Sequence, residues 1–137
     1  MNRNFGFSLV ELMITLAIVA IVASIALPTY QDQIRKSRRA DGTTLLTEIR
    51  DLQERFFMEN NTYTTALSGL GYTGSVKSDE EYYQVQVENP AGCGIANCFR
   101  LLASPILEIQ EEDGGLRLWS DGTRERKVGG VWQTGWD

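Results

Sequence analysis

The sequence contains no histidine, and this absence excludes several kinds of chemistry. Neither the Ser-His-Asp nor the Cys-His type of nucleophilic site can form without histidine, and most zinc sites lose a ligand. The sequence also lacks a phosphate-binding loop and a nucleophile elbow. We therefore predict that the protein is not an enzyme and that it uses no cofactor and no metal.

Cysteine is scarce as well, because the chain has only Cys93 and Cys98. Two cysteines exclude a four-cysteine metal site. Their close spacing fits one local disulfide, which would indicate a compartment outside the cytoplasm. Two free, buried thiols fit the same spacing, so the sequence leaves both states open.

Positive charge is in deficit over the whole chain, whose formal net charge is -5. A net negative protein has no general attraction to nucleic acid. The length of 137 residues suits one modest domain. Residues that enter a membrane cannot contribute to the globular core.

A long apolar run occupies residues 7–27, with the sequence FSLVELMITLAIVAIVASIAL. It contains 21 residues and one charge, Glu11. A helix of about 20 apolar residues spans a bilayer, so this segment can cross a membrane. A secretory signal is the alternative, because Ser24-Ile25-Ala26 offers a small-x-small cleavage site.

Glu11 is the informative residue of this run. A carboxylate inside a membrane segment costs several kcal/mol and is commonly functional. The run contains no Lys, Arg or His, so the partner of Glu11 must be a chain terminus, another subunit or a proton. Alternatively, Glu11 lies close enough to the interface to reach water.

The segment Gly6-Phe7-Ser8-Leu9-Val10-Glu11-Leu12 resembles the prepilin signature of type IV pilins and type II secretion pseudopilins. The match continues through the apolar run to Pro28 and Tyr30. The resemblance implies cleavage after Gly6 by prepilin peptidase and N-methylation of Phe7. It also implies that Glu11 pairs with the new terminal ammonium of a neighbouring subunit, and that Glu11 and Pro28 serve filament assembly.

The resemblance also implies a domain layout. Residues 1–6 would be the leader, 7–29 the transmembrane and assembly helix, and 30–137 a periplasmic head. Within the head we expect an amphipathic helix at 30–60, a loop at 61–79 and an antiparallel sheet at 80–137. The fold class is α+β, with the long N-terminal helix packed against a small antiparallel sheet.

By this resemblance the protein is a structural subunit of a type IV pilus, a minor pilin. Its partners would be other pilin subunits, prepilin peptidase and the inner membrane before assembly, and it would end in a cell-surface pilus. Adhesion and twitching motility are outputs of such filaments. The alternatives are a type II secretion pseudopilin and a pilin module that binds DNA or a surface.

Residues 30–60 carry helical spacing, with apolar side chains at Leu45, Ile49, Leu52 and Phe56. The opposite face is polar and includes Gln53. Asn60-Asn61 marks the predicted end of the helix. Pro28 and Gly42 are expected to be weak points of this helix.

A basic cluster follows the apolar run, formed by Arg35, Lys36, Arg38 and Arg39. A solvated collar beside anionic lipid headgroups is favoured over a DNA contact, because the cluster has no interleaved aromatic residues. The positive-inside rule would place the C-terminal side in the cytoplasm, against the resemblance. We give the leader signature more weight, because Asp32 and Asp41 dilute the cluster.

Strand patterns occur at residues 82–87, 99–103 and 116–119, with further pairing expected at 125–128 and 131–132. The resemblance to minor pilins would imply a C-terminal disulfide, but at the comparable places this chain has Gly114-Gly115 and Gly135-Trp136, so both cysteines of that bond are missing. We expect packing of the three tryptophans, Trp119, Trp132 and Trp136, to hold this region instead. The acids Glu111, Glu112, Asp113 and Asp121 match no compact calcium loop, and an acidic turn is the simpler interpretation.

Overall fold

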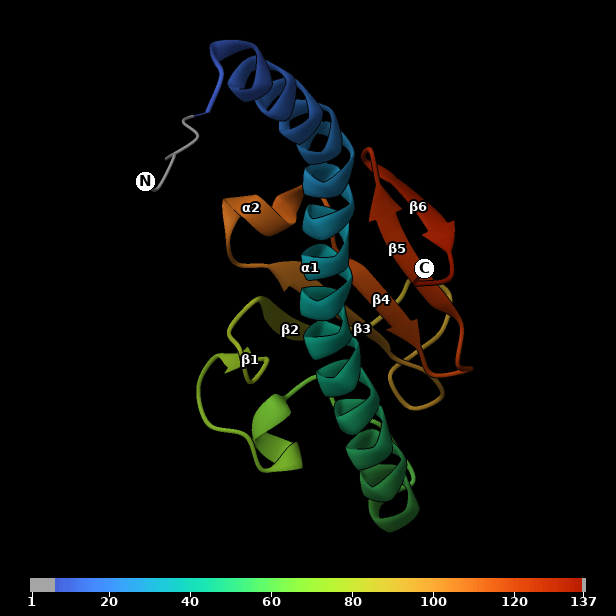
Figure 1. Ribbon diagram of the computed structural model, residues 1–137. Coiled ribbons are helices and arrows are strands. Elements are labelled where there is room, and N and C mark those ends of the chain that lie inside the picture. Colours follow the sequence, from blue (N-terminus) through green and yellow to red (C-terminus); the bar gives the residue numbers. More distant parts are fainter. Residues whose placement is uncertain (1–6, 137) are drawn as a thin grey trace. The chain divides into compact units, whose positions relative to one another are not determined.

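The computed structural model describes residues 7–136, except for the side chain of Ile109 (Figure 1). The predicted leader, residues 1–6 with Gly6, lies outside the described residues. The chain divides into two compact units, of which the first ends at Ile34 and the second begins at Arg35. Helix α1 (Leu9–Asn60) contributes residues to both units.

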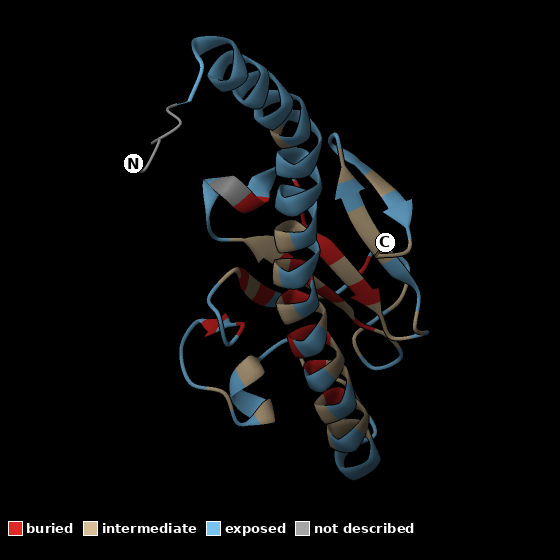
Figure 2. Ribbon diagram, in the orientation of Figure 1, coloured by how far each residue is buried: buried red, intermediate tan, exposed pale blue. Residues whose placement is uncertain are grey.

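The first unit is a helical segment with exposed side chains. From Leu9 to Leu27 its large apolar side chains are 50% to 76% exposed, and Figure 2 colours this part of α1 almost entirely as exposed. A window of 18 residues has a mean hydropathy of 2.6, long and apolar enough to cross a membrane. The hydroxyls of Thr15 and Ser24 donate to carbonyls of the preceding turn. Pro28 does not end the helix, which continues through it.

The second unit contains a six-stranded antiparallel sheet in the order β1-β2-β3-β4-β5-β6. The strands are β1 (Val76–Lys77), β2 (Tyr83–Glu88), β3 (Arg100–Pro105), β4 (Leu116–Trp119), β5 (Arg124–Val128) and β6 (Val131–Thr134). The part of α1 from Arg35 onward packs on one face of this sheet (Figure 1). The predicted α+β fold, a long helix on an antiparallel sheet, is confirmed.

Two segments differ from the sequence prediction. The expected loop at 61–79 contains the 3₁₀ helix η1 (Leu67–Leu70) and strand β1. A one-turn helix, α2 (Glu108–Glu111), lies between β3 and β4. Both helices are too short to leave a periodic pattern in the sequence.

The core lies between α1 and the inner face of the sheet. Side chains alternate along each strand, so every second residue faces the helix. The buried apolar residues are Leu45, Leu46, Ile49, Val76, Tyr83, Val85, Phe99, Leu101, Ala103, Leu116 and Leu118. Helical spacing correctly predicted the burial of Leu45 and Ile49, and alternation in β2 that of Tyr83 and Val85.

Gly42 has a different role from the one predicted. It is buried, and a Cβ atom at this position would lie 2.7 Å from Cδ2 of Tyr83 and 3.1 Å from Cδ1 of Leu116. The glycine therefore permits the Tyr83 ring to contact the helix backbone. The sequence suggested that Gly42 is a weak point of α1. In the structure it is a close packing contact instead.

Gln53 was placed on the polar face of the helix, and this prediction is wrong. Its side chain is fully buried. The amide Nε2 donates to the Thr64 carbonyl, and Oε1 accepts from the Thr64 N–H at 3.1 Å. Both the N–H and the oxygen of the amide are hydrogen-bonded, so burial of this polar group carries little energetic penalty. The predicted end of α1 at Asn60 is confirmed, and Asn61 has a positive φ of 53°.

Candidate functional site

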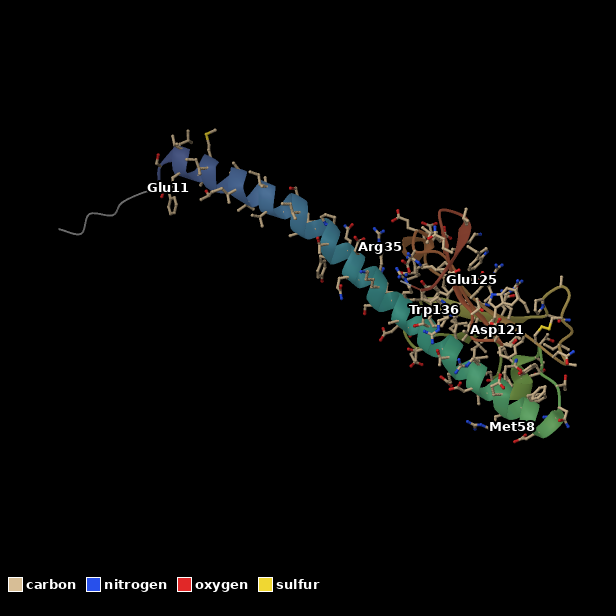
Figure 3. The ribbon with its side chains drawn as sticks, turned by 90° about the vertical axis from the view of Figure 1, so that its right-hand side faces the viewer. Glu11, Arg35, Met58, Asp121, Glu125 and Trp136 are labelled. Carbon is tan, nitrogen blue, oxygen red and sulfur yellow. A yellow bond between two sulfur atoms is a disulfide. The ribbon has the colours of Figure 1, made fainter. Side chains whose placement is uncertain are left out.

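The first turn of α1 carries the predicted assembly residue. Phe7 and Glu11 are both exposed, and the Leu12 N–H donates to the Ser8 carbonyl at 3.1 Å to open the helix. Figure 3 shows Glu11 at the start of the helix. A negative side chain in the first turn is favoured by the helix dipole, but only by about 0.3–1 kcal/mol. That gain is smaller than the cost of a carboxylate in a membrane segment.

A local partner for Glu11 is absent within residues 7–136. Ser8 and Glu11 have the spacing of a capping box, in which the acid would accept from the backbone N–H of Ser8. The Glu11 carboxylate makes neither that bond nor an ion pair with any described residue. Local helix capping therefore does not account for this acid.

The four basic residues after the span do not form one solvated patch. Lys36 is exposed, whereas Arg35 pairs with Glu112 at 3.2 Å. The guanidinium of Arg38 lies over the Tyr82 ring, 5.0 Å from its centroid. Arg39 is only 8% exposed. The collar prediction is thus wrong for Arg39, because its side chain enters the head.

Arg39 and Asp113 form the centre of a buried polar network. Arg39 donates through Nε and Nη2 to the two carboxylate oxygens of Asp113, at 2.8 and 2.5 Å. Arg126 and Gln110 donate to the same carboxylate at 3.1 Å, and the Tyr83 hydroxyl lies 3.3 Å from it. Burial raises the pKa of Tyr83, and the charge of Asp113 raises it further. The Asp113 carboxylate is therefore held by two arginines, Arg39 and Arg126.

The same arginine holds the C-terminal segment. Arg39 Nη1 donates to the Trp136 carbonyl at 2.6 Å, and Trp136 Nε1 donates to the Arg117 carbonyl at 3.1 Å. Arg124 lies over the Trp136 ring at 4.8 Å from the centroid. The sequence predicted that packing of Trp136 helps to hold the C-terminal segment. In addition, Arg39 joins Asp113 to this segment.

A shallow groove of about 440 Å³ lies beside this segment. It is lined by Lys36, Arg39, Ala40, Thr43, Arg124, Gly135 and Trp136. Sequence reasoning singled out Lys36 and Arg39 through the basic cluster, but not Ala40 or Thr43. It missed Arg124, because nothing local in the sequence places residue 124 beside residue 36.

A second groove, of about 640 Å³, lies on the outer face of the sheet. The Trp132 ring is stacked by Arg117, whose guanidinium carbon lies 3.6 Å from the ring centroid. Lys127 lines the same groove, together with Glu111 and Glu112 at its α2 end. Burial lowers the pKa of Arg117, and the charge of nearby Arg100 lowers it further.

Cys93 and Cys98 form the predicted disulfide, visible as a yellow bond in Figure 3. It closes a short loop between β2 and β3. The carbonyl of Ile95, inside this loop, accepts from the Tyr63 N–H at 3.2 Å. The Tyr63 ring in turn packs against Phe57 and Phe99. The disulfide loop is thereby tied to the segment that follows α1.

Two family comparisons match this chain. The model of the family described as type IV minor pilin ComP, DNA uptake sequence receptor, matches residues 28–114, more than half of the chain. The model of the prokaryotic N-terminal methylation motif matches residues 1–27. Together they cover both the span and most of the head.

Individual relatives carry pilin names. The chain is 31% identical over 116 residues to a fimbrial protein of Neisseria meningitidis and to the type IV major pilin protein PilE of Neisseria gonorrhoeae. Each match covers 84% of this chain and 65% or 66% of the relative. The type IV major pilin protein PilA of Myxococcus xanthus is 36% identical over 70 residues, or 51% of this chain and 32% of that protein. The chain thus spans less than two thirds of these relatives.

The fold and the comparisons agree. An exposed apolar helix leads into a head in which the same helix packs on an antiparallel sheet. The chain belongs to the type IV pilins, in the family described as type IV minor pilin ComP, DNA uptake sequence receptor.

Proposed function

We propose that this protein is a structural, non-catalytic subunit of a type IV pilus, in the role of a minor pilin. Prepilin peptidase would cleave after Gly6, and the new N-terminus at Phe7 would be methylated. The layout is then a leader at 1–6, a span at 7–29 and a periplasmic head at 30–137. Support comes from the methylation-motif match over residues 1–27 and from the exposed apolar surface of α1.

Assembly with other pilin subunits follows from that surface. The apolar side chains of residues 9–27 are exposed, so they need either lipid or other helices around them. The inner membrane would supply lipid before assembly, and neighbouring subunits would supply helices in the filament at the cell surface. Pro28 lacks a backbone N–H, so it leaves a carbonyl of the preceding turn without its helical donor. We infer that this local weakness lets α1 adjust between the two environments.

The observation that carries the proposal is the carboxylate of Glu11, which has no partner among residues 7–136. A charge in an apolar surface is costly unless it is paired. Cleavage after Gly6 would create an ammonium on Phe7, and parallel helices offset along a filament can bring the ammonium of one subunit to Glu11 of the next. Because an unpaired charge costs so much in a low dielectric, this pair would fix the stagger between subunits.

Replacement of Glu11 by alanine tests this role, with Glu59→Ala as a control at an exposed acid near the end of α1. Loss of the pair should lower incorporation of the subunit into sheared pili by more than about tenfold, the effect of about 1.4 kcal/mol. The amount of subunit in the membrane should stay unchanged. Normal incorporation of Glu11→Ala, or a mature chain that retains residues 1–6 by mass spectrometry, would refute the proposal.

DNA binding is a second candidate function, favoured by the printed description of the matching family. Among the described residues, side chains suited to DNA binding lie on the outer face of the sheet. Arg117 and Lys127 line a groove there with the Trp132 ring, which suits phosphate contacts beside an aromatic surface. Arg100 on the same face is largely neutralised by Glu88, 2.7 Å away.

Salt-dependent DNA binding by the full chain in detergent micelles tests this function. Lys127→Gln should weaken duplex binding and reduce the slope of log affinity against log salt by about 1. Lys77→Gln is the matched control, since Lys77 is an exposed lysine on β1, at the opposite edge of the sheet. Equal binding by the parent and Lys127→Gln would exclude the outer face as the DNA surface.

A further inference from the structure

The two edges of the sheet differ in what protects them. The edge strands are β1 and β6, because the order of the sheet runs from β1 to β6 (Figure 1). β1 has two residues, carries Lys77 and is followed by three acidic residues at 79–81. β6 has four residues and contains neither a charged side chain nor a proline. Charges, proline and short length are the usual means of preventing an edge strand from pairing, so β6 is the less protected edge.

The pairing of β6 with β5 fixes which main-chain groups of β6 face outward. The Gly135 N–H donates to the Arg124 carbonyl at 2.8 Å, so Gly135 faces β5. Main-chain groups alternate in direction along a strand that has no bulge, so the N–H and C=O groups of Trp132 and Thr134 face away from β5. Within residues 7–136, no strand or loop pairs with these four groups. They form an open row of donors and acceptors.

The same reasoning identifies the outward groups of β1. The Ser78 N–H donates to the Tyr83 carbonyl at 2.8 Å, so Ser78 faces β2. By alternation, the main-chain groups of Lys77 and Ser75 that follow the opposite direction face outward. Val76 is buried in the core, so the side chains of its two neighbours lie on the outer face of the sheet.

The direction of the strands allows the two edges to meet. Each of the six strands is antiparallel to the next, so β1 and β6 run in opposite directions. At both edges the outward main-chain groups belong to residues with outer-face side chains, Trp132 on β6 and Lys77 on β1. β6 of one copy can therefore pair with β1 of a second copy that has the same orientation. Pairing of β6 with a second β6 would need a two-fold axis, which subunits of one filament do not share.

We propose that β6 binds β1 of a second copy of this chain, so that the sheet continues from one head to the next. Trp132 lies opposite Lys77, and Thr134 lies opposite Ser75, because this register keeps both residues of β1 alongside β6. The Lys77 ammonium is then a cross-strand neighbour of the Trp132 ring. Since two different surfaces meet, the contact repeats along a row of subunits and does not close as a dimer. This inference rests on the proposed assembly of subunits in one orientation.

The charges of the two surfaces are complementary. The β5–β6 hairpin, residues 124–134, carries three basic side chains and one acidic side chain. Strand β1 and the turn after it, residues 76–81, carry one basic and three acidic side chains. In the proposed register no two like charges lie directly opposite each other, an arrangement that would destabilise a strand pair. Two β6 edges would instead bring together two hairpins of the same net charge.

A pair of cysteines tests the register. Ser75 and Thr134 are both exposed, and they lie on opposite edges of a six-stranded sheet, roughly 24 Å apart at the usual spacing of strands. One chain cannot bridge them, since a disulfide needs Cα atoms within about 7 Å. In the proposed contact they lie opposite each other, about 5.5 Å apart between Cα atoms. The full chain with Ser75→Cys and Thr134→Cys, oxidised in membranes of cells that overproduce it, should form a ladder of linked chains. The parent should form none, because its two cysteines are bonded to each other.

Two controls separate this contact from random collision and from a two-fold dimer. Thr44→Cys with Thr134→Cys should give no ladder, because Thr44 is an exposed residue of α1 and does not lie on an edge strand. Gln133→Cys alone should give no dimer. A two-fold pairing of β6 would place Gln133 opposite its own copy, so dimers of this single variant would overturn the proposal. A ladder as strong with Thr44→Cys as with Ser75→Cys would do the same.

A proline at Lys77 tests the main-chain hydrogen bonds. Lys77→Pro removes an outward N–H and no hydrogen bond to β2, which is the position where an edge strand tolerates proline. Added to Ser75→Cys with Thr134→Cys, it should abolish the ladder, whereas Lys77→Ala keeps the N–H and should retain the ladder. A ladder that survives Lys77→Pro refutes strand pairing. A chain that is present in the membrane but never forms the ladder refutes the edge contact alone, whereas a chain absent from the membrane refutes the membrane-held state as well.

Discussion

Arg39 of helix α1 donates two hydrogen bonds to the carboxylate of Asp113, a residue 74 positions later in the chain. Their side chains are 9% and 4% exposed. Because Arg39 also donates to the Trp136 carbonyl, one side chain connects the helix, the segment before β4 and the C-terminal segment. This region is where the sequence lacks the disulfide expected of a minor pilin.

Removal of one partner from this pair should be strongly destabilising. Arg39→Met leaves the Asp113 carboxylate buried with only part of its partners, and such changes cost about 3–5 kcal/mol. Denaturant unfolding in detergent micelles, followed by tryptophan fluorescence, measures the loss, since all three tryptophans lie in the second unit. Arg50→Met is the control, because the exposed pair with Asp51 should contribute about 1 kcal/mol at most.

The double variant Arg39→Met with Asp113→Leu separates charge from packing. Replacement of both partners removes the buried charge together with its counter-charge, so much of the lost stability should return. A double variant as unstable as Arg39→Met alone would show that packing of the arginine stem, rather than the ion pair, stabilises this region.

Local patterns predicted the parts of the fold that depend on periodicity. Leu45 and Ile49 are buried because they repeat at helical spacing, and Tyr83 and Val85 because they alternate in a strand. Glu11 could be singled out because its chemistry conflicts with its immediate neighbours. Arg39, Gln53 and Arg124 could not be placed, because their partners are distant in sequence and their polarity suggested solvent.

Gly42→Ala should destabilise the head although alanine favours a helix. The added Cβ would lie 2.7 Å from Cδ2 of Tyr83, and overpacking of a core costs about 1–3 kcal/mol. Helix propensity returns at most about 1 kcal/mol. We therefore expect a net loss in the same unfolding assay. Thr44→Ala, at an exposed position of α1, should instead be neutral or slightly stabilising. A stabilised Gly42→Ala would contradict the packing contact.

Loss of the disulfide should have a local effect. In the chain-entropy model, a loop as short as that between Cys93 and Cys98 contributes about 2 kcal/mol. The double replacement Cys93→Ser with Cys98→Ser should also weaken the hydrogen bond from Tyr63 to Ile95. Amide hydrogen exchange should accelerate at Tyr63 and within the loop, while Leu118 in β4 keeps its protection relative to global unfolding. Equal acceleration at both places would argue against a local role.

Alkaline pH should destabilise the head through Tyr83. Burial and the Asp113 carboxylate raise the pKa of its phenol in the folded state above the unfolded value of about 10. A raised pKa means that the folded state favours the neutral phenol. Its contribution is therefore complete below about pH 10 and is lost as the pH rises toward the folded value.

The variant Tyr83→Phe isolates this contribution. At neutral pH it should lose about 1–2 kcal/mol, because Gln110 no longer has the hydroxyl that accepts its Nε2 hydrogen bond. Above pH 10 the stability of the variant should fall less steeply than that of the parent. The difference between the two slopes should be about 1.4 kcal/mol per pH unit. Tyr72→Phe is the comparison, since burial and Glu48 raise the pKa of Tyr72 to about 12. Parallel pH profiles for Tyr83→Phe and the parent would show that Tyr83 is not the group that titrates.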